Sequence, residues 1–247
     1  MENIYVSEDG FIYIKMCARI RWIDGNFMVN VLAIGAHPDD IELGCSATLS
    51  RLRKERCKIY VLVLSMGEAS GDPEIREKEC RKSAELLGVD KFFFGGLRDT
   101  EISDGIETIR VIDRVIEEVE PEIVYTHSPK DTHQDHRNAA YASLSAGRRV
   151  KKIFLYESPR AFREFLPQVY VEVDEEIELK NNLIGLFPSQ HSKEWWSLGP
   201  KTLHAWEGLA AYRGFQAGVK WAEAFEVGRL VISKGEQVHH MKNTIHV

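Results

Sequence analysis

The sequence has few of the features that mark secreted, membrane-spanning or nucleic-acid-binding proteins. It contains only four cysteines, without a CxxC spacing, so we interpret them as small apolar core residues in a reducing compartment. No apolar run approaches the roughly 20 residues that cross a bilayer, and no basic segment followed by an apolar one opens the chain. We therefore expect a cytoplasmic protein without a membrane span.

An excess of basic charge is also lacking. The 247 residues carry 32 basic and 38 acidic side chains, mixed along the chain, for a formal net charge of −6. No basic stripe is available to neutralise the phosphates of a nucleic acid, so nucleic acid is not an expected partner. With 44 % hydrophobic residues, the chain is long enough to bury a sizeable core.

Residues 1–27 precede the regular part of the chain. Two β-rich runs, at 4–6 and 11–14, flank Asp9-Gly10, a dipeptide typical of hairpin turns. Alternatively, the stretch lies upstream of the true domain, because Met28 stands directly before the first strong strand and could itself be a start. We predict an N-terminal extension at 1–27, either a hairpin or an upstream segment, and a single domain at 28–247.

From residue 29 onward, strand patterns alternate with helical ones. Strands are expected at 29–35, 58–65, 91–95 and 122–127, and helices at 47–56, 73–87, 106–119 and from residue 133. The strands lack strict alternation, which is typical of a parallel sheet buried on both faces. The pattern predicts an α/β fold with a doubly wound, mostly parallel, Rossmann-like sheet. Additional strands at 153–156 and 169–173 and a long helix at 202–225 are expected after it.

The most chemically specific stretch, residues 35–44 (GAHPDDIELG), lies where the first of these strands gives way to a helix. Neighbouring side chains diverge on a tight turn, so His37 and Asp40 can converge on one point while Asp39 is directed beside it. Imidazole nitrogen and carboxylate oxygen are ligands suited to Zn²⁺ or Fe²⁺. A catalytic zinc site normally has three protein ligands, so one must come from elsewhere.

A second polar cluster, residues 133–136 (HQDH), offers the missing ligand. If Asp131 and Thr132 help to cap a helix that begins near residue 133, His133 and His136 lie on one face of it. His136 can then complete the metal shell, with His133 beside the open coordination positions. Asp135 can hydrogen-bond an imidazole and so fix its tautomer. For His127, on the preceding strand, a supporting or core role is expected.

Residues 36–44 and 133–137 together resemble the LmbE-like, or PIG-L-type, family of metal-dependent N-acetylglucosaminyl deacetylases. The resemblance covers residues 29–231, and Arg76-Glu77, Ser189-Gln190 and residues 222–225 (AEAF) also agree with it. The chain departs from the family at Gln134, where a proline is usual; this affects the rigidity of the turn more than ligation.

The resemblance implies a zinc-dependent N-deacetylase, a hydrolase of linear amide C–N bonds. The ion, Zn²⁺ with Fe²⁺ as the alternative, would be held by His37, Asp40 and His136. Asp39 would act as general base toward the metal-bound water, which the ion makes acidic. The product pair would be acetate and a free amine.

The remaining catalytic roles implied by the resemblance fall to the second cluster. His133 would stabilise the oxyanion or protonate the leaving amine, and Asp135 would orient it. The substrate would be a small N-acetylated sugar or glycoside of N-acetylglucosamine type, and the protein a homo-oligomer.

Substrate contacts are predicted on loops after the strand ends and in the C-terminal part. Arg76 and Asp99 are expected to contact the sugar, as is Gln190. Trp195-Trp196 provide either a platform on which a sugar stacks or core packing.

Two other classes of function compete with this interpretation. A non-catalytic or nucleotide-binding doubly wound domain predicts a glycine-rich phosphate loop, but the first turn here is His-Pro-Asp-Asp. A metal-dependent hydrolase of another bond, such as a phosphoester, usually assembles more carboxylates around two metals.

Overall fold

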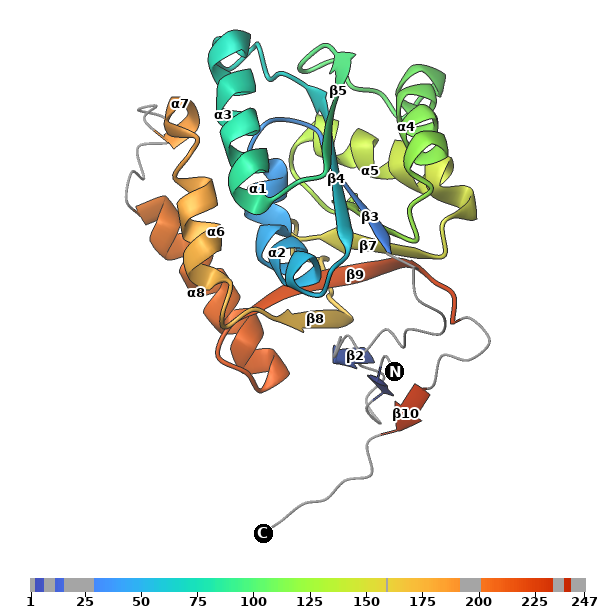
Figure 1. Cartoon of the computed structure of the whole chain (residues 1–247), viewed down its shortest axis with the longest axis vertical. Helices are drawn as coiled ribbons and strands as arrows, with labels where there is room; N and C mark the ends of the chain where they lie inside the picture. Colours follow the sequence, from blue (N-terminus) through green and yellow to red (C-terminus); the bar gives the residue numbers. More distant parts are fainter. Residues whose placement is uncertain are drawn as a thin grey trace.

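The computed structural model describes residues 3–6, 12–15, 29–158, 160–191, 201–232 and 238–240. Its centre is a seven-stranded sheet with the order β5-β4-β3-β6-β7-β9-β8 (Figure 1). The strands are β3 (Asn30–Gly35), β4 (Lys58–Ser65), β5 (Lys91–Leu97), β6 (Ile123–His127), β7 (Lys152–Tyr156), β8 (Val169–Glu172) and β9 (Ala222–Leu230). Strands β3 to β7 run parallel to one another, and β9 runs antiparallel to both β7 and β8. The expected α/β class with a mostly parallel sheet is confirmed.

Helices cover both faces of this sheet. They are α1 (Asp40–Gly44), α2 (Ser46–Lys54), α3 (Pro73–Leu87), α4 (Ile106–Val119), α5 (Gln134–Ala146), η1 (Gly147–Arg149), α6 (Ile177–Ile184), α7 (Pro188–His191) and α8 (Lys201–Ala217). In Figure 1, α1, α2 and α3 lie on one side of the central strands, and α4 and α5 on the other. This is the doubly wound arrangement in which ligands bind at the carboxyl ends of the strands.

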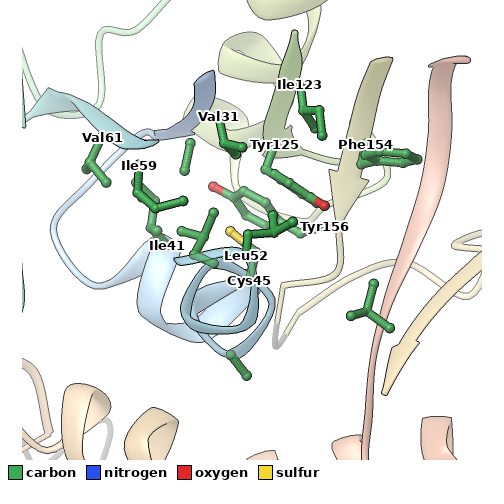
Figure 2. Close-up of a cluster of buried hydrophobic side chains, with 14 of the residues drawn as sticks. Val31, Ile41, Cys45, Leu52, Ile59, Val61, Ile123, Tyr125, Phe154 and Tyr156 are labelled. Atoms are coloured by element: carbon green, nitrogen blue, oxygen red, sulfur yellow. The ribbon is translucent and has the colours of Figure 1, made fainter. Parts of the chain in front are cut away.

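Successive residues of β3 enter different hydrophobic clusters. Val31 belongs to a cluster with side chains of α2, and Leu32 to a second cluster with side chains of α4 and α5. Figure 2 shows part of the first cluster, which includes Val31 of β3, Tyr125 of β6 and Ile41 of α1. Both faces of the strand are therefore buried, which explains its continuous apolar sequence.

The predicted helix 202–225 is wrong at its C-terminal end. Helix α8 ends at Ala217, and strand β9 begins at Ala222. Gly218 adopts a left-handed conformation with φ of 71°, and Val219 N donates back to Gly214 O. Glycine tolerates this conformation, which ends the helix and turns the chain into the sheet.

A small second sheet has the order β10-β1-β2. Strands β1 (Asn3–Val6) and β2 (Ile12–Lys15) are antiparallel, and β10 (Val238–His240) pairs with β1 in parallel. The division into an extension at 1–27 and a domain at 28–247 stays a prediction. No helix in the described part of the chain has both the length and the apolar character needed to cross a membrane.

Candidate metal centre

Five histidine and aspartate side chains meet at the carboxyl ends of β3, β5 and β6. His37 and Asp40 follow β3, Asp99 follows β5, His127 ends β6, and His136 lies in the first turn of α5. These strands are parallel, so their ends share one edge of the sheet, where open α/β folds place their sites.

The turn between β3 and α1 is tight and partly left-handed. His37 N donates to Asp40 Oδ2 at 2.7 Å, and Asp39 has φ of 89°, a region that aspartate enters more readily than most residues. A Cβ at Gly35 would stand 3.2 Å from Asp40 Cβ. The absence of a side chain at Gly35 thus lets α1 approach the strand closely. Asp40 is thereby brought next to His37.

The two ring nitrogens of His37 have different surroundings. Nε2 lies 3.0 Å from Asp99 Oδ1 and 3.1 Å from Asp135 Oδ2. Nδ1 lies on the other side of the ring, 3.6 Å from Asp40 Oδ2. Two carboxylates therefore hold one edge of the ring, and the other edge faces Asp40.

His136 repeats this arrangement from the opposite side of Asp40. Its Nδ1 lies 2.8 Å from Asp131 Oδ2, and its Nε2 lies 3.3 Å from Asp40 Oδ1. In a metal-binding histidine, the ring nitrogen that does not bind the metal characteristically donates its N–H to a carboxylate, and this hydrogen bond fixes the tautomer. His37 and His136 both have this partner, and both direct the remaining nitrogen at Asp40.

The electrostatics reflect a compact, buried cluster of opposite charges. Burial raises the pKa of Asp40, but His136 and His127 outweigh it and hold that pKa well below its usual range. Burial lowers the pKa of His136, but Asp40 and Asp131 raise it to about 9. For His37, contacts with Asp135, Asp40 and Asp99 likewise overcome burial and raise the pKa well above its usual value. A divalent cation could replace the protons that these rings hold.

His127 lies closer to the centre than the sequence suggested. Its Nε2 is 3.0 Å from Asp40 Oδ2 and accepts from Ala36 N at 3.2 Å, while its buried Nδ1 has no hydrogen-bond partner. The ring stacks on His136 with a centroid separation of 4.0 Å. Burial and the charge of His136 lower the pKa of His127 to about 4, against the opposing effect of Asp40.

Several side-chain sets have the spacing of metal ligands. Those whose ligand atoms lie within 4.8 Å of one another are His37/His133/His136, Asp40/His127/His136 and His37/Asp99/Asp135. The predicted ligands His37, Asp40 and His136 do not form one of these sets but are distributed over them. His37 and His136 each approach Asp40, and the centroids of their two rings lie 5.4 Å apart. The donor atoms, imidazole nitrogen and carboxylate oxygen, fit Zn²⁺ or Fe²⁺.

Asp39 stands beside this centre. Only 17 % of its side chain is exposed, and Oδ1 lies 3.8 Å from Arg76 Nη2. Burial raises the pKa of Asp39 to about 7, against the opposing charge of Arg76. A carboxyl group with this pKa can exchange a proton at neutral pH.

His133 is the N-cap of α5 and borders the same space. Its Nδ1 accepts from Asp135 N at 3.2 Å, which leaves the proton on Nε2. The ring centroid lies 4.9 Å from that of His37 and 4.6 Å from that of His136. Burial and the positive charge of His136 lower the pKa of His133, so the ring is a neutral hydrogen-bond donor.

The side chain of Asp135 differs from the expected arrangement. Its carboxylate does not orient His133; Oδ2 instead contacts His37 Nε2 and accepts from Thr100 N at 2.8 Å. Helical side chains tilt toward the N-terminus, and from the first turn of α5 this tilt carries Asp135 toward the end of β3. Only the backbone N–H of Asp135 reaches His133.

The predicted substrate contacts lie around loop 66–72. Arg76 is buried, with Nη1 donating to Gly67 O and Nη2 donating to Pro38 O, each at 2.8 Å. Gln190 is buried too, with Oε1 accepting from Ser70 Oγ at 3.4 Å. Arg76 thus connects loop 66–72 to the turn between β3 and α1. Trp195 and Trp196 lie outside the described residues.

Sequence reasoning missed Asp131 as the partner of His136, assigning it only a capping role. Asp131 does both, because Oδ1 accepts from His133 N at 2.8 Å while Oδ2 contacts the ring of His136. The sequence did carry a signal for this contact: an acidic residue, Asp131, stands shortly before a helix start that contains His133 and His136.

Comparison with known proteins agrees with this geometry. Residues 32–146 match the family described as PIG-L, GlcNAc-PI de-N-acetylase, and this range contains both clusters. The chain is 38 % identical over 153 residues to the uncharacterized deacetylase YaiS of Escherichia coli, covering 59 % of this chain and 83 % of that protein. It is 26 % identical over 229 residues to the diacetylchitobiose deacetylase of Thermococcus kodakarensis, covering 80 % of this chain and 82 % of the relative.

Among solved structures, the conserved protein TT1542 from Thermus thermophilus superposes with a TM-score of 0.75 and 27 % identity. The match covers 86 % of this chain and 100 % of that one.

Proposed function

This chain belongs to the PIG-L family of de-N-acetylases, and on that premise we propose that it is a metal-dependent amide hydrolase. Its substrate would be an amino sugar of N-acetylglucosamine type, from which it removes the acetyl group. The diacetylchitobiose deacetylase relative supports this substrate class, because the name describes an acetylated disaccharide as the compound it acts on.

One observation carries the metal assignment. His37 Nε2 and His136 Nδ1 each contact a carboxylate, and the remaining nitrogen of each ring faces the carboxylate of Asp40. The surrounding carboxylates raise the pKa values of both rings, so the cluster favours positive charge, and a divalent cation can supply that charge in place of the ring protons. We assign His37, Asp40 and His136 as the ligands of Zn²⁺, with Fe²⁺ as the alternative.

The ion would supply a water of lowered pKa and an electrophile for the acetyl carbonyl. Asp39 is the group that accepts the proton from the attacking water. Its pKa of about 7 keeps a large share of the carboxylate form available at neutral pH. Arg76, 3.8 Å from Asp39 Oδ1, favours that form by its positive charge.

His133 acts on the opposite side of the scissile amide. Its Nε2–H can donate to the oxyanion that would develop on the acetyl carbonyl. Alternatively, Nε2 gives its own proton to the leaving amine, and the proton that Asp39 accepted from the attacking water then restores it, so that the amine gains one proton in total. The N–H of Asp135 fixes the tautomer that makes this possible. Loss of one such donor typically lowers turnover by about 10²–10³-fold.

We assign sugar recognition to the loops at the rim of the centre. Gln190 and Ser70 lie together there, and Arg76 supports them from below. Gln190 stays the predicted sugar contact. Its Oε1 accepts from Ser70 Oγ and its Nε2 donates to Ser189 Oγ, so a sugar hydroxyl would take the place of one of these partners.

Acetate release tests the proposal directly. The purified protein is incubated with N-acetylglucosamine, N,N′-diacetylchitobiose, a UDP-linked N-acetylglucosamine and simple N-acetylglucosaminyl glycosides, with and without a chelator. We expect acetate from at least one compound, loss of release after chelation, and recovery on adding Zn²⁺ or Fe²⁺. Release that survives complete metal removal would contradict the metal assignment, and no release from any compound by the metal-loaded protein would contradict the substrate class.

A further inference from the structure

Helix α3 presents two buried side chains three positions apart, Arg76 and Glu79. Residues with this spacing lie on the same face of a helix. Arg76 donates to loop 66–72, and the carboxylate of Glu79 accepts from α7. Building on the proposed function, we infer that Glu79 is a positioning residue, which places α7 so that Gln190 contacts the sugar at the rim of the metal centre.

Both carboxylate oxygens of Glu79 hold the start of α7 through one residue. Oε1 accepts from Ser189 N at 3.0 Å, and Oε2 accepts from Ser189 Oγ at 2.5 Å. Ser189 lies in the first turn of α7, where a backbone N–H has no acceptor within the helix. Glu79 supplies that acceptor from a different helix and also binds the side chain, so it sets where α7 lies against α3.

The same serine extends the contact to Gln190. Ser189 Oγ accepts from Gln190 Nε2 at 3.1 Å, and Gln190 Oε1 accepts from Ser70 Oγ at 3.4 Å. Ser70 Oγ in turn accepts from Arg76 Nη1 at 2.9 Å. The contacts therefore form a closed ring that begins and ends on α3. Gln190 lies in this ring at the point where α7 meets loop 66–72.

A buried carboxylate suits a role that requires a fixed orientation. Only 6 % of Glu79 is exposed, and burial of a charged group is costly unless hydrogen bonds compensate for it. Hydrophobic packing is non-directional, whereas a hydrogen-bonded polar network specifies one arrangement. Arg76 Nη2 also donates to Pro38 O at 2.8 Å, in the turn between β3 and α1. The ring thus fixes Gln190 relative to the metal centre.

The Michaelis constant separates this role from a purely structural one. KM, kcat and zinc content are measured for the wild type, Glu79→Ala, Glu79→Gln, Gln190→Ala and the double variant Glu79→Ala/Gln190→Ala. The substrate is the compound that releases most acetate among N-acetylglucosamine, N,N′-diacetylchitobiose, UDP-linked N-acetylglucosamine and the simple glycosides. Glu85→Gln is the matched control, because Glu85 is an exposed acidic residue of the same helix.

We expect Glu79→Ala and Gln190→Ala each to raise KM about 2–10-fold, the contribution of one hydrogen bond, with kcat and zinc content unchanged. The double variant should have the KM of Gln190→Ala alone, because both substitutions remove the same sugar contact. Glu79→Gln should raise KM less, since its amide oxygen can still accept from Ser189 N. Glu85→Gln should match the wild type.

The other outcomes overturn the inference in distinguishable ways. An unchanged KM in folded Glu79→Ala and Glu79→Gln shows that Glu79 places no sugar contact, and Glu79→Gln decides alone if Glu79→Ala does not fold. Effects that multiply in the double variant show that Glu79 acts other than through Gln190, and lost zinc places its effect on the metal centre. An unchanged KM in Gln190→Ala removes the sugar contact and this inference with it, while the proposed hydrolase activity stands. If the wild type releases no acetate from any compound, the proposed function itself fails.

Discussion

Asp131 Oδ2 lies 2.8 Å from Nδ1 of His136, on the side of the ring opposite Asp40. The contact comes from the loop just before α5, and Asp131 also accepts from His133 N through its other oxygen. One carboxylate thus holds both histidines of the second cluster in place. It couples the start of the helix to His136, the proposed metal ligand.

This relationship predicts that Asp131→Ala weakens metal binding without removing a ligand. We expect about a 10–100-fold lower Zn²⁺ affinity, since the ring of His136 loses the acceptor that fixes its tautomer. The measurement is zinc competition on the apo-protein. Asp131→Asn is the matched control: its one acceptor oxygen can serve His136 or His133, so an intermediate affinity is expected. Equal affinities in all three proteins would show that the contact does not tune the site.

A comparison of histidine variants discriminates the ligand sets. His37→Ala and His136→Ala should each lose stoichiometric metal, because each removes one of three ligands. His127→Ala should retain it, although His127 Nε2 lies only 3.0 Å from Asp40 Oδ2. Metal content after purification and dialysis, measured by plasma emission, checks this. A metal-free His127→Ala with a metal-loaded His37→Ala would instead indicate the set Asp40/His127/His136.

The sheet and the convergence of the two clusters could be predicted from the sequence because they depend on local patterns. The apolar run that became β3 and the polar turn after it are contiguous, and parallel topology places the ends of β3 and β6 together. Capping is similarly local: Asp72 accepts from Glu74 N, Pro73 opens α3 and a left-handed Gly88 ends it.

The contacts behind the ligands could not be predicted in this way. Whether Asp135 faces His37 or His133 depends on the angle at which α5 meets the sheet, and the contact of Asp99 with His37 depends on where the turn after β5 lies. Both are tertiary properties that spacing does not encode. The end of α8 was mispredicted for a related reason, since its small and aromatic residues continue into β9 without a polar break and only Gly218 marks the turn.

The buried ion pair of Lys180 with Glu223, next to α1, should contribute to stability. Lys180 Nζ donates to Glu223 Oε1 at 2.6 Å and to Leu43 O at 2.7 Å, and the two oxygens of Glu223 accept from Ala47 N and Thr48 N. Removing one partner leaves an uncompensated buried charge, so Lys180→Ala should lower the free energy of unfolding by about 3–5 kcal/mol. Urea titration of the apo-protein measures it.

The exposed pair of Arg81 with Glu77 is the matched control. Arg81 Nη2 lies 2.6 Å from Glu77 Oε1, and 61 % of the Arg81 side chain and 41 % of the Glu77 side chain are exposed. Arg81→Ala should therefore change the free energy of unfolding by no more than about 1 kcal/mol. If Lys180→Ala and Arg81→Ala lower the free energy of unfolding by similar amounts, the buried pair does not stabilise the fold more than the exposed pair does.

Asp39→Asn should keep the metal and lose most turnover. Asp39 is not among the proposed ligands, and an amide cannot accept the proton of the attacking water. We expect a fall in kcat of about 10²–10⁴-fold with an unchanged metal content. Metal analysis and acetate release on the same preparation check both parts. Wild-type turnover in the Asp39→Asn protein would require a different general base.

The pH dependence of turnover should report the same carboxyl group. As the proposed general base, Asp39 would act only when deprotonated. We therefore expect kcat/KM to rise with pH and level off above the pKa of Asp39, which burial raises to about 7 in the metal-free site. A bound cation favours the carboxylate, so in the metal-loaded enzyme the rise should lie at or below that pH.

Arg76 also lowers the pKa of Asp39. Arg76→Met should therefore move the rise to higher pH, and Arg76→Lys should move it less. Profiles of kcat/KM at saturating metal measure the shift, and an identical rise in all three proteins would show that another group controls it.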